Sequence, residues 1–208
     1  MKKWLPCLFA ALACLAAGAQ TPDEILEKMS AQIERSDAEG LAMVMDIKIP
    51  ILGTISSKVQ TRGKKSRVEF SAMGQKQTIW SDGVTEWSFD EKENTLTIKN
   101  DDPAKGSDAE DNLSMFSDTD DGYDSAIRKE TADEWHIRLT KKKTNTDKDD
   151  PQTMDFVVNQ ADYMPKSLSA SIKGIKVIMH GFRLGVSEKA VTFTPDACPG
   201  AVVKDERP

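Results

Sequence analysis

Apolar and polar residues alternate along most of the chain, beginning with residues 41–51. Every second residue from Leu41 to Ile51 is apolar, which is the pattern of a strand that buries one face. Shorter runs of the same kind, separated by turn residues such as Ser81-Asp82-Gly83, predict further strands. They cover residues 55–61, 68–72, 77–80, 87–89, 95–99, 135–139, 154–158, 167–172, 175–184 and 191–193. The alternation therefore predicts a mainly β (α+β) fold, an antiparallel meander of about ten strands.

A helical period precedes the first strand. Thr21 can cap a helix, Pro22 fits its first turn, and Glu24 can complete a capping box. Apolar residues then recur at helical spacing on one side of an otherwise polar segment. We expect one amphipathic helix that ends near Ser36.

The acidic stretch 100–124 interrupts the strands. Ser107 and Glu110 offer a second capping box, which predicts a short central helix over residues 108–116. The run Asp118-Thr119-Asp120-Asp121-Gly122 resembles a calcium loop, but its acidic residues lack the alternate spacing and no Glu follows at the twelfth position. A solvated turn is the preferred interpretation, and no metal site is predicted.

The first nineteen residues have the three regions of a secretory signal peptide. Two lysines precede an apolar stretch that ends at Leu15, and the small residues Ala17-Gly18-Ala19 follow. The stretch is shorter than the ~20 apolar residues that span a bilayer. We expect cleavage after Ala19 and a periplasmic product, a single domain over residues 20–208.

Cys14 offers an alternative. Ala11-Leu12-Ala13-Cys14 resembles a degraded lipobox, in which Ala11 replaces the usual Leu, and acylation there would anchor the protein to a membrane. If Cys7 and Cys14 instead leave with the signal peptide, Cys198 is the only remaining cysteine. No intramolecular disulfide could then form, so the apolar core alone would hold the fold.

Charge and side-chain chemistry reduce the number of functions that the protein could have. The formal charge is −6, and removal of Lys2 and Lys3 makes it −8, so the surface repels nucleic acid. Neither His136 nor His180 has a partner at metal-ligand spacing. The sequence contains no nucleophile elbow, phosphate-binding glycine loop or nucleotide motif. We therefore expect a binding protein without a cofactor rather than an enzyme.

Methionines are frequent at the predicted core positions, and methionine fills irregular or changing shapes well. They are Met43, Met45, Met73, Met115, Met154, Met164 and Met179. One interpretation is an ordinary core; the other is an apolar cavity for an acyl chain between a curved sheet and helices too few to cover it. The residues predicted to line such a cavity are Met43, Met45, Ile47, Val68, Phe70, Trp87 and Phe89.

Two passages resemble the LolA family of outer-membrane lipoprotein carriers. Residues 78–90 (Thr-Ile-Trp-Ser-Asp-Gly-Val-Thr-Glu-Trp-Ser-Phe-Asp) resemble its hairpin of SDG, a Trp after three residues, an aromatic residue and Asp. Val191 to Pro195, followed by Gly200 to Asp205, resembles its closing strand. The resemblance implies a curved, incomplete antiparallel barrel whose apolar concave face is covered by helices. It also implies a monomeric chaperone-like carrier that moves lipoprotein acyl chains across the periplasm, from an inner-membrane release complex to an outer-membrane acceptor.

The sequence departs from the family pattern at the basic stretch Arg62 to Arg67. The family often has a basic-Pro element there, with an arginine that latches the lid, whereas this stretch lacks Pro. Lys64 falls nearest the latch position, and Arg67 is the other candidate. Two further hypotheses remain: a lipid-anchored acceptor of the same fold if Cys14 is acylated, and a sensor or scaffold domain that binds a protein partner through a closed core.

Overall fold

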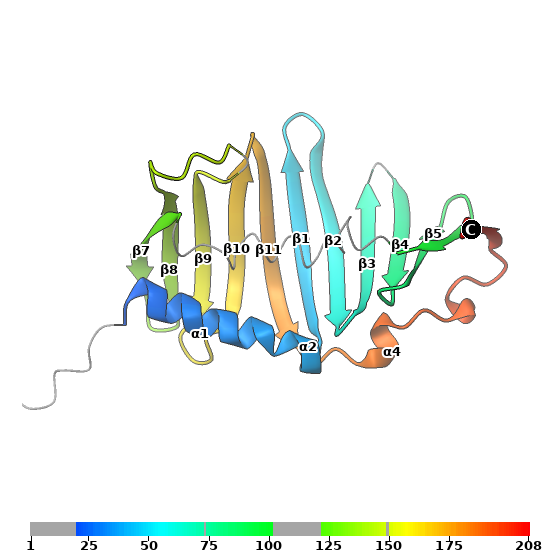
Figure 1. Ribbon diagram of the computed structural model, residues 1–208, viewed down its shortest axis with the longest axis horizontal. Coiled ribbons are helices and arrows are strands. Elements are labelled where there is room, and N and C mark those ends of the chain that lie inside the picture. The colour runs from blue at the N-terminus through cyan, green and yellow to red at the C-terminus, as the bar shows by residue number, and fades with distance from the viewer. Residues whose placement is uncertain (1–19, 73, 102–121, 149) are drawn as a thin grey trace, which may run out of the picture.

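The computed structural model, which describes residues 20–72, 74–101, 122–148 and 150–208, contains one 12-stranded sheet (Figure 1). Its order is β12-β6-β5-β4-β3-β2-β1-β11-β10-β9-β8-β7, and all neighbours are antiparallel except β12 and β6. The strands are β1 (Leu41–Ile49), β2 (Gly53–Arg62), β3 (Lys65–Ala72), β4 (Gln75–Ser81), β5 (Thr85–Asp90), β6 (Thr95–Asn100), β7 (Tyr123–Glu130), β8 (Glu134–Lys141), β9 (Thr153–Asn159), β10 (Pro165–Ile172), β11 (Ile175–Leu184) and β12 (Val202–Asp205). The sheet is curved and open, which confirms the predicted fold class.

In the described part of the chain, three helices accompany the sheet: α1 (Pro22–Glu34), α2 (Ser36–Glu39) and α4 (Glu188–Val191), with a 3₁₀ turn at Pro195–Ala197. The predicted capping box is present, because the Thr21 hydroxyl accepts from the Glu24 amide and the Glu24 carboxylate accepts from the Thr21 amide. In Figure 1, α1 runs across the lower ends of the strands from β7 towards β11. No helix in the described ranges is long and apolar enough to cross a membrane.

Some predicted elements are wrong. The strand predicted over 191–193 is absent, because α4 ends at Val191, and the apolar residues there pack against the sheet instead of pairing with it. The first strand ends at Ile49, two residues early, and the next residues form a turn. The alternation missed β7 and β12 because these edge strands are mostly exposed and bury no regular apolar face. The signal peptide, the predicted helix 108–116, most of the calcium-like run, Met73 and Met115 lie outside the described residues.

Strand pairing assigns each side chain to one of two faces. Directly opposite residues of antiparallel strands point to the same side, and the register is continuous from β1 to β6. Met43 pairs with Val59, Val59 with Val68, Val68 with Ile79, and Ile79 with Ser88. We call this side the helix face, because Ile25 and Met29 of α1 pack against it.

The opposite side is the tail face. There Gln60 pairs with Arg67, Arg67 with Trp80, and Trp80 with Trp87. Residues 186–201, between β11 and β12, which we call the tail, pack on it near β1 and β4–β6. The sheet is therefore covered on both faces, by different parts of the chain.

Candidate functional site

The largest apolar cluster lies on the helix face beneath α1. Its fully buried members include Phe156, Leu168 and Met179, each at most 1% exposed. Met43 and Met45 belong to the same cluster at 3% and 5% exposure. These two predicted site residues are therefore packed into the core of the structure.

A partly exposed apolar patch borders this cluster on β1–β4 and β11. Ile47 pairs with both Ile55 and Val177, Val68 pairs with Ile79, and Phe70 pairs with Ser57, which itself faces Met45. Each member is intermediate in exposure. We call this set the apolar patch: Ile47, Ile55, Val68, Phe70, Ile79 and Val177. The patch contains three of the predicted site residues, and together with Met43 and Met45 they share one face.

Trp87 and Phe89 lie on the tail face instead, so the expectation that they share a face with Met43, Met45 and Phe70 is wrong. Trp87 stacks on Phe193 at 5.0 Å between ring centroids, and Phe89 belongs to the same cluster. The two residues do share a side of their own strand, as predicted, but only the register across β1–β5 decides which side that is. Their place in lipid binding stays a prediction.

The N-terminal half of α1 is fixed to the sheet by an aromatic stack. Tyr163, at the turn after β9, stacks on Trp135 at 5.5 Å, and Lys28 of α1 lies 4.9 Å above its ring. The Gln20 amide donates to the Tyr163 hydroxyl at 3.0 Å. The hydrogen bond with Gln20 is the main cause of a lowered Tyr163 pKa, with a smaller contribution from Lys28.

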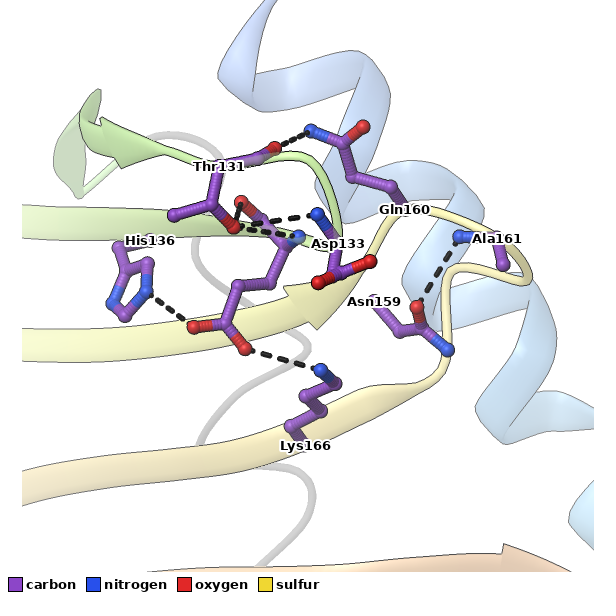
Figure 2. Close-up of polar contacts among 8 residues, drawn as sticks. Thr131, Asp133, His136, Asn159, Gln160, Ala161 and Lys166 are labelled. Atoms are coloured by element: carbon purple, nitrogen blue, oxygen red, sulfur yellow. Dashed lines mark hydrogen bonds and ion pairs between the residues drawn. The ribbon is translucent and has the colours of Figure 1, made fainter.

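Polar contacts join the β7–β8 and β9–β10 turns (Figure 2). The Gln160 side chain donates to the Thr131 carbonyl at 2.9 Å, which joins the β9–β10 and β7–β8 turns. Glu134 accepts from Lys166 at 3.1 Å and lies 2.8 Å from His136 Nε2, and these contacts, Lys166 first, lower the pKa of its carboxyl group. In the same β9–β10 turn, the Tyr163 amide donates to the Asn159 carbonyl at 2.9 Å. Among the described residues, no three His, Cys, Asp or Glu side chains are grouped to hold a metal ion.

The C-terminal end of the helix pair is fixed by Arg62. Its Nη1 donates to the carbonyl of Glu39, at the end of α2, at 3.1 Å and to that of Val186 at 2.7 Å. Gly40 permits this approach, because it has φ +76° and a Cβ there would lie 2.7 Å from the Val186 carbonyl oxygen. Arg62 thus joins the helices, β2 and the tail at one point.

The two predicted latch candidates lie elsewhere. Lys64 is exposed in the β2–β3 turn, and Arg67 lies over Trp80 on the tail face and forms an ion pair with Glu69 at 2.6 Å. Within the described ranges, neither donates to a helix carbonyl. Sequence reasoning missed Arg62, although it opens the basic stretch that drew attention to Lys64. A latching role for Lys64 or Arg67 remains a prediction.

A separate cleft of about 560 Å³ opens between the helices and the lower ends of β9–β11. Its apolar lining includes Met164, Phe182 and Leu184, whereas Arg35 and Glu39 add charge from the helix side. This mixed lining suits an acyl chain less well than the apolar patch does.

An open, curved antiparallel sheet with an N-terminal helix on one face is the fold of LolA-like proteins, and the chain has this fold. No family model and no curated protein matches its sequence. Among solved structures, LprF from Mycobacterium bovis aligns with 82% of this chain and 96% of its own, with 10% identity and a TM-score of 0.51. LppX from Mycobacterium tuberculosis aligns with 80% of this chain and 98% of its own (13% identity, TM-score 0.49), and a LolA superfamily protein from Nitrosomonas europaea with 84% and 99% (15% identity, TM-score 0.36). At 10% identity, the similarity to LprF shows the fold alone.

Proposed function

We propose that the protein is an exported, non-catalytic carrier that binds lipid acyl chains at the apolar patch. The observation that carries this proposal is the continuity of the patch with the buried methionine-rich cluster under α1. A ligand that enters at Val68 would meet Val59 and then Met43, next to Met45, and all of these side chains are apolar. Phe70 lies beside this route, with Ser57 between it and Met45. The LolA-like fold and the predicted signal peptide support the same function.

The residues around the patch can adapt to a chain of variable shape. Met29, Met43, Met45, Met154 and Met179 all belong to the adjoining cluster, and methionine side chains repack at low cost. Each buried methylene of an acyl chain contributes ~0.8 kcal/mol. Half a chain, about eight methylenes, would contribute only ~6 kcal/mol, so micromolar binding, which needs ~8 kcal/mol after the cost of association, requires that most of a chain is buried.

The more specific role is transfer of lipoproteins across the periplasm towards the outer membrane, with a release complex and an acceptor as partners. It rests on the two motifs of the LolA family and on the predicted cleavage after Ala19. The mass of the intact, secreted protein tests this step. A chain that begins at Gln20 supports a diffusible carrier, whereas a diacylglycerol adduct on Cys14 would favour the lipid-anchored acceptor.

Lipid binding itself is tested by native mass spectrometry of the purified mature protein and by titration with a fluorescent fatty acid. Phe70→Glu is the sharpest variant, because Phe70 is only half-buried and a carboxylate there can stay hydrated. We expect it to weaken probe binding at least about tenfold without unfolding the protein. Val84→Glu, at a position 72% exposed in the β4–β5 turn, is the matched control and should bind normally.

Two results together would overturn the proposal: no lipid that co-purifies, and equal probe binding by wild type and Phe70→Glu. The fold would then serve as a sensor or scaffold domain for a protein partner.

A further inference from the structure

The connection between β1 and β2 exposes apolar side chains that the fold does not use. Ile51 is 105% exposed, the highest value among the large apolar residues that the structure describes, and its neighbour Leu52 is 65% exposed. Figure 1 shows this connection rising above the adjoining strands, at the end of the sheet opposite to α1. We call Pro50, Ile51 and Leu52 the hairpin tip.

The backbone of the hairpin tip is strained. Ile51 has φ +71°, a left-handed conformation that is unfavourable for a β-branched residue. Glycine, asparagine or aspartate would suit such a position better, and none of them would expose a large apolar side chain to water. The chain instead places isoleucine where it gains no contact in the folded monomer. Strain of this kind persists where a function maintains it.

Positive charge lies directly below the hairpin tip. Lys48 and Lys176 are opposite each other in the β1–β11 register, and like charges in this position repel. The neighbouring β10–β11 turn lies close by, since a Cβ on Gly174 would be 4.0 Å from the Pro50 ring. On this side of β1 the carboxylate of Asp46 is bonded to Ser56 and His180, and the attraction of the Lys48 charge is the smallest of the influences that lower its pKa. On a protein with a formal charge of −6, this local excess of cations suits an anionic partner.

The other side of the same strand is apolar. Ile49 and Ile47 follow the tip on the helix face, and Ile47 belongs to the apolar patch. An apolar path therefore leads from the tip to the patch, whereas the lysines point to the tail face. Apolar residues at an apex, with cations just behind them, are the composition of an interfacial membrane anchor.

We infer that the hairpin tip docks the protein on a bilayer that contains anionic lipid. Pro50, Ile51 and Leu52 enter the boundary between headgroups and acyl chains, and Lys48 and Lys176 contact lipid phosphates. This docking needs no cargo and stands independently of the proposed carrier function. It would bring the apolar patch to the membrane from which an acyl chain has to be taken.

Flotation of the mature protein with vesicles tests the inference. We expect binding to vesicles of phosphatidylglycerol and phosphatidylcholine and little binding to phosphatidylcholine alone. Ile51→Ser with Leu52→Ser should weaken vesicle binding about tenfold or more. The matched control is Val202→Ser with Val203→Ser on β12, two apolar side chains of similar exposure (61% and 58%), which should bind like the wild type.

Two further variants separate insertion and charge from folding. Ile51→Gly removes the apolar side chain, so it should weaken vesicle binding. It also relieves the strain of the positive φ angle, so the melting temperature should stay equal or rise. Lys48→Gln with Lys176→Gln should abolish the preference for anionic vesicles, whereas Lys58→Gln with Lys204→Gln should retain it. Equal binding of all variants, or absence of wild-type binding to anionic vesicles, would overturn the inference. Loss of fatty-acid binding with intact vesicle binding would overturn only the carrier function.

Discussion

The two halves of the sheet bury opposite faces. Strands β7–β11 and β1 bury the helix face beneath α1, where Phe156 and Met179 are at most 1% exposed. Strands β4–β6 bury the tail face beneath residues 193–201, where Trp80 and Leu96 are 5% exposed and the remaining aromatic residues are only partly buried. The first half is thus the more completely packed one.

The apolar patch lies where the covered face changes. On β2 and β3 the helix face still carries Val59, Val68 and Phe70, but its next neighbours on β5 and β6 are polar, for example Ser88 and Thr97. Partly exposed apolar side chains collect at this boundary because α1 packs against the strands of the first half, while the tail covers the other face. An open sheet can therefore form a binding surface where the covered face changes from one side of the sheet to the other.

The largest effect should come from a test of the packing difference. Phe156→Ala should cost ~3–5 kcal/mol of unfolding free energy, because the buried ring leaves a cavity. Phe193→Ala, in the second half, should cost less, ~1–2 kcal/mol, because the ring is only partly buried. Urea unfolding with an unchanged m-value measures both. Equal costs would show that the halves are packed equally well.

The junction of the two halves at Arg62 should give the next largest effect. Arg62→Met removes two charge-assisted hydrogen bonds to the Glu39 and Val186 carbonyls and should cost ~1–3 kcal/mol. Faster hydrogen exchange should appear at α2 and at residues 185–186, while the centre of β9 stays protected. Lys64→Met, two residues away and exposed, should change stability by less than ~0.5 kcal/mol. A larger loss from Lys64→Met would restore Lys64 as the latch.

The sequence was sufficient for elements whose local pattern matches their surroundings. The alternation from Leu41 to Ile49 predicted β1 because that strand buries one face, and Thr21 with Glu24 predicted the start of α1 because a capping box is complete within four residues. Edge strand β12 could not be predicted from alternation, since all its residues are exposed.

The candidate site was less predictable because it depends on contacts between distant residues. Trp87 could be placed on a face only by following the register through four neighbouring strands, and a shift of one residue would reverse the result. Arg62 acquires its role through Val186, 124 residues away. Charge and position in the basic stretch pointed to Lys64, but only the folded chain distinguishes a solvated cation from a hydrogen-bonded one.

The two tyrosines of the chain sharpen the comparison within the first half. Burial, with Asp150 and Asp147, raises the pKa of Tyr123 to about 12, whereas the hydrogen bond with Gln20 lowers that of Tyr163. Tyrosinate absorbance should therefore rise in two separate steps, and Tyr123→Phe should remove the later one. A single absorbance step would contradict the difference in burial.

Tyr123 also affects stability. Because its pKa is raised on folding, Tyr123 contributes stability that is complete below pH 10 and is lost as pH rises towards 12. Loss of its hydrogen bond to the Pro151 carbonyl should cost about 1 kcal/mol at neutral pH.

The smallest effect concerns how the tail is held on the second half. Lys65 of β3 donates to Glu188 of α4 at 2.7 Å and to the Thr192 hydroxyl at 3.2 Å, and the hydrogen bond from Lys65 lowers the pKa of the Glu188 carboxyl group. Because that pKa is depressed on folding, the ion pair contributes above the ordinary pKa of 4.5 and is lost as pH falls through the folded value. Lys65→Met should therefore lower the melting temperature slightly at neutral pH and less in acid, and added salt should reduce the difference, since exposed ion pairs are weak and screened. In a double-mutant cycle with Glu188→Gln, the effect of Lys65→Met that persists belongs to Thr192 and should be independent of pH. If Lys65→Met is as costly as Phe193→Ala, charge rather than aromatic packing holds the tail.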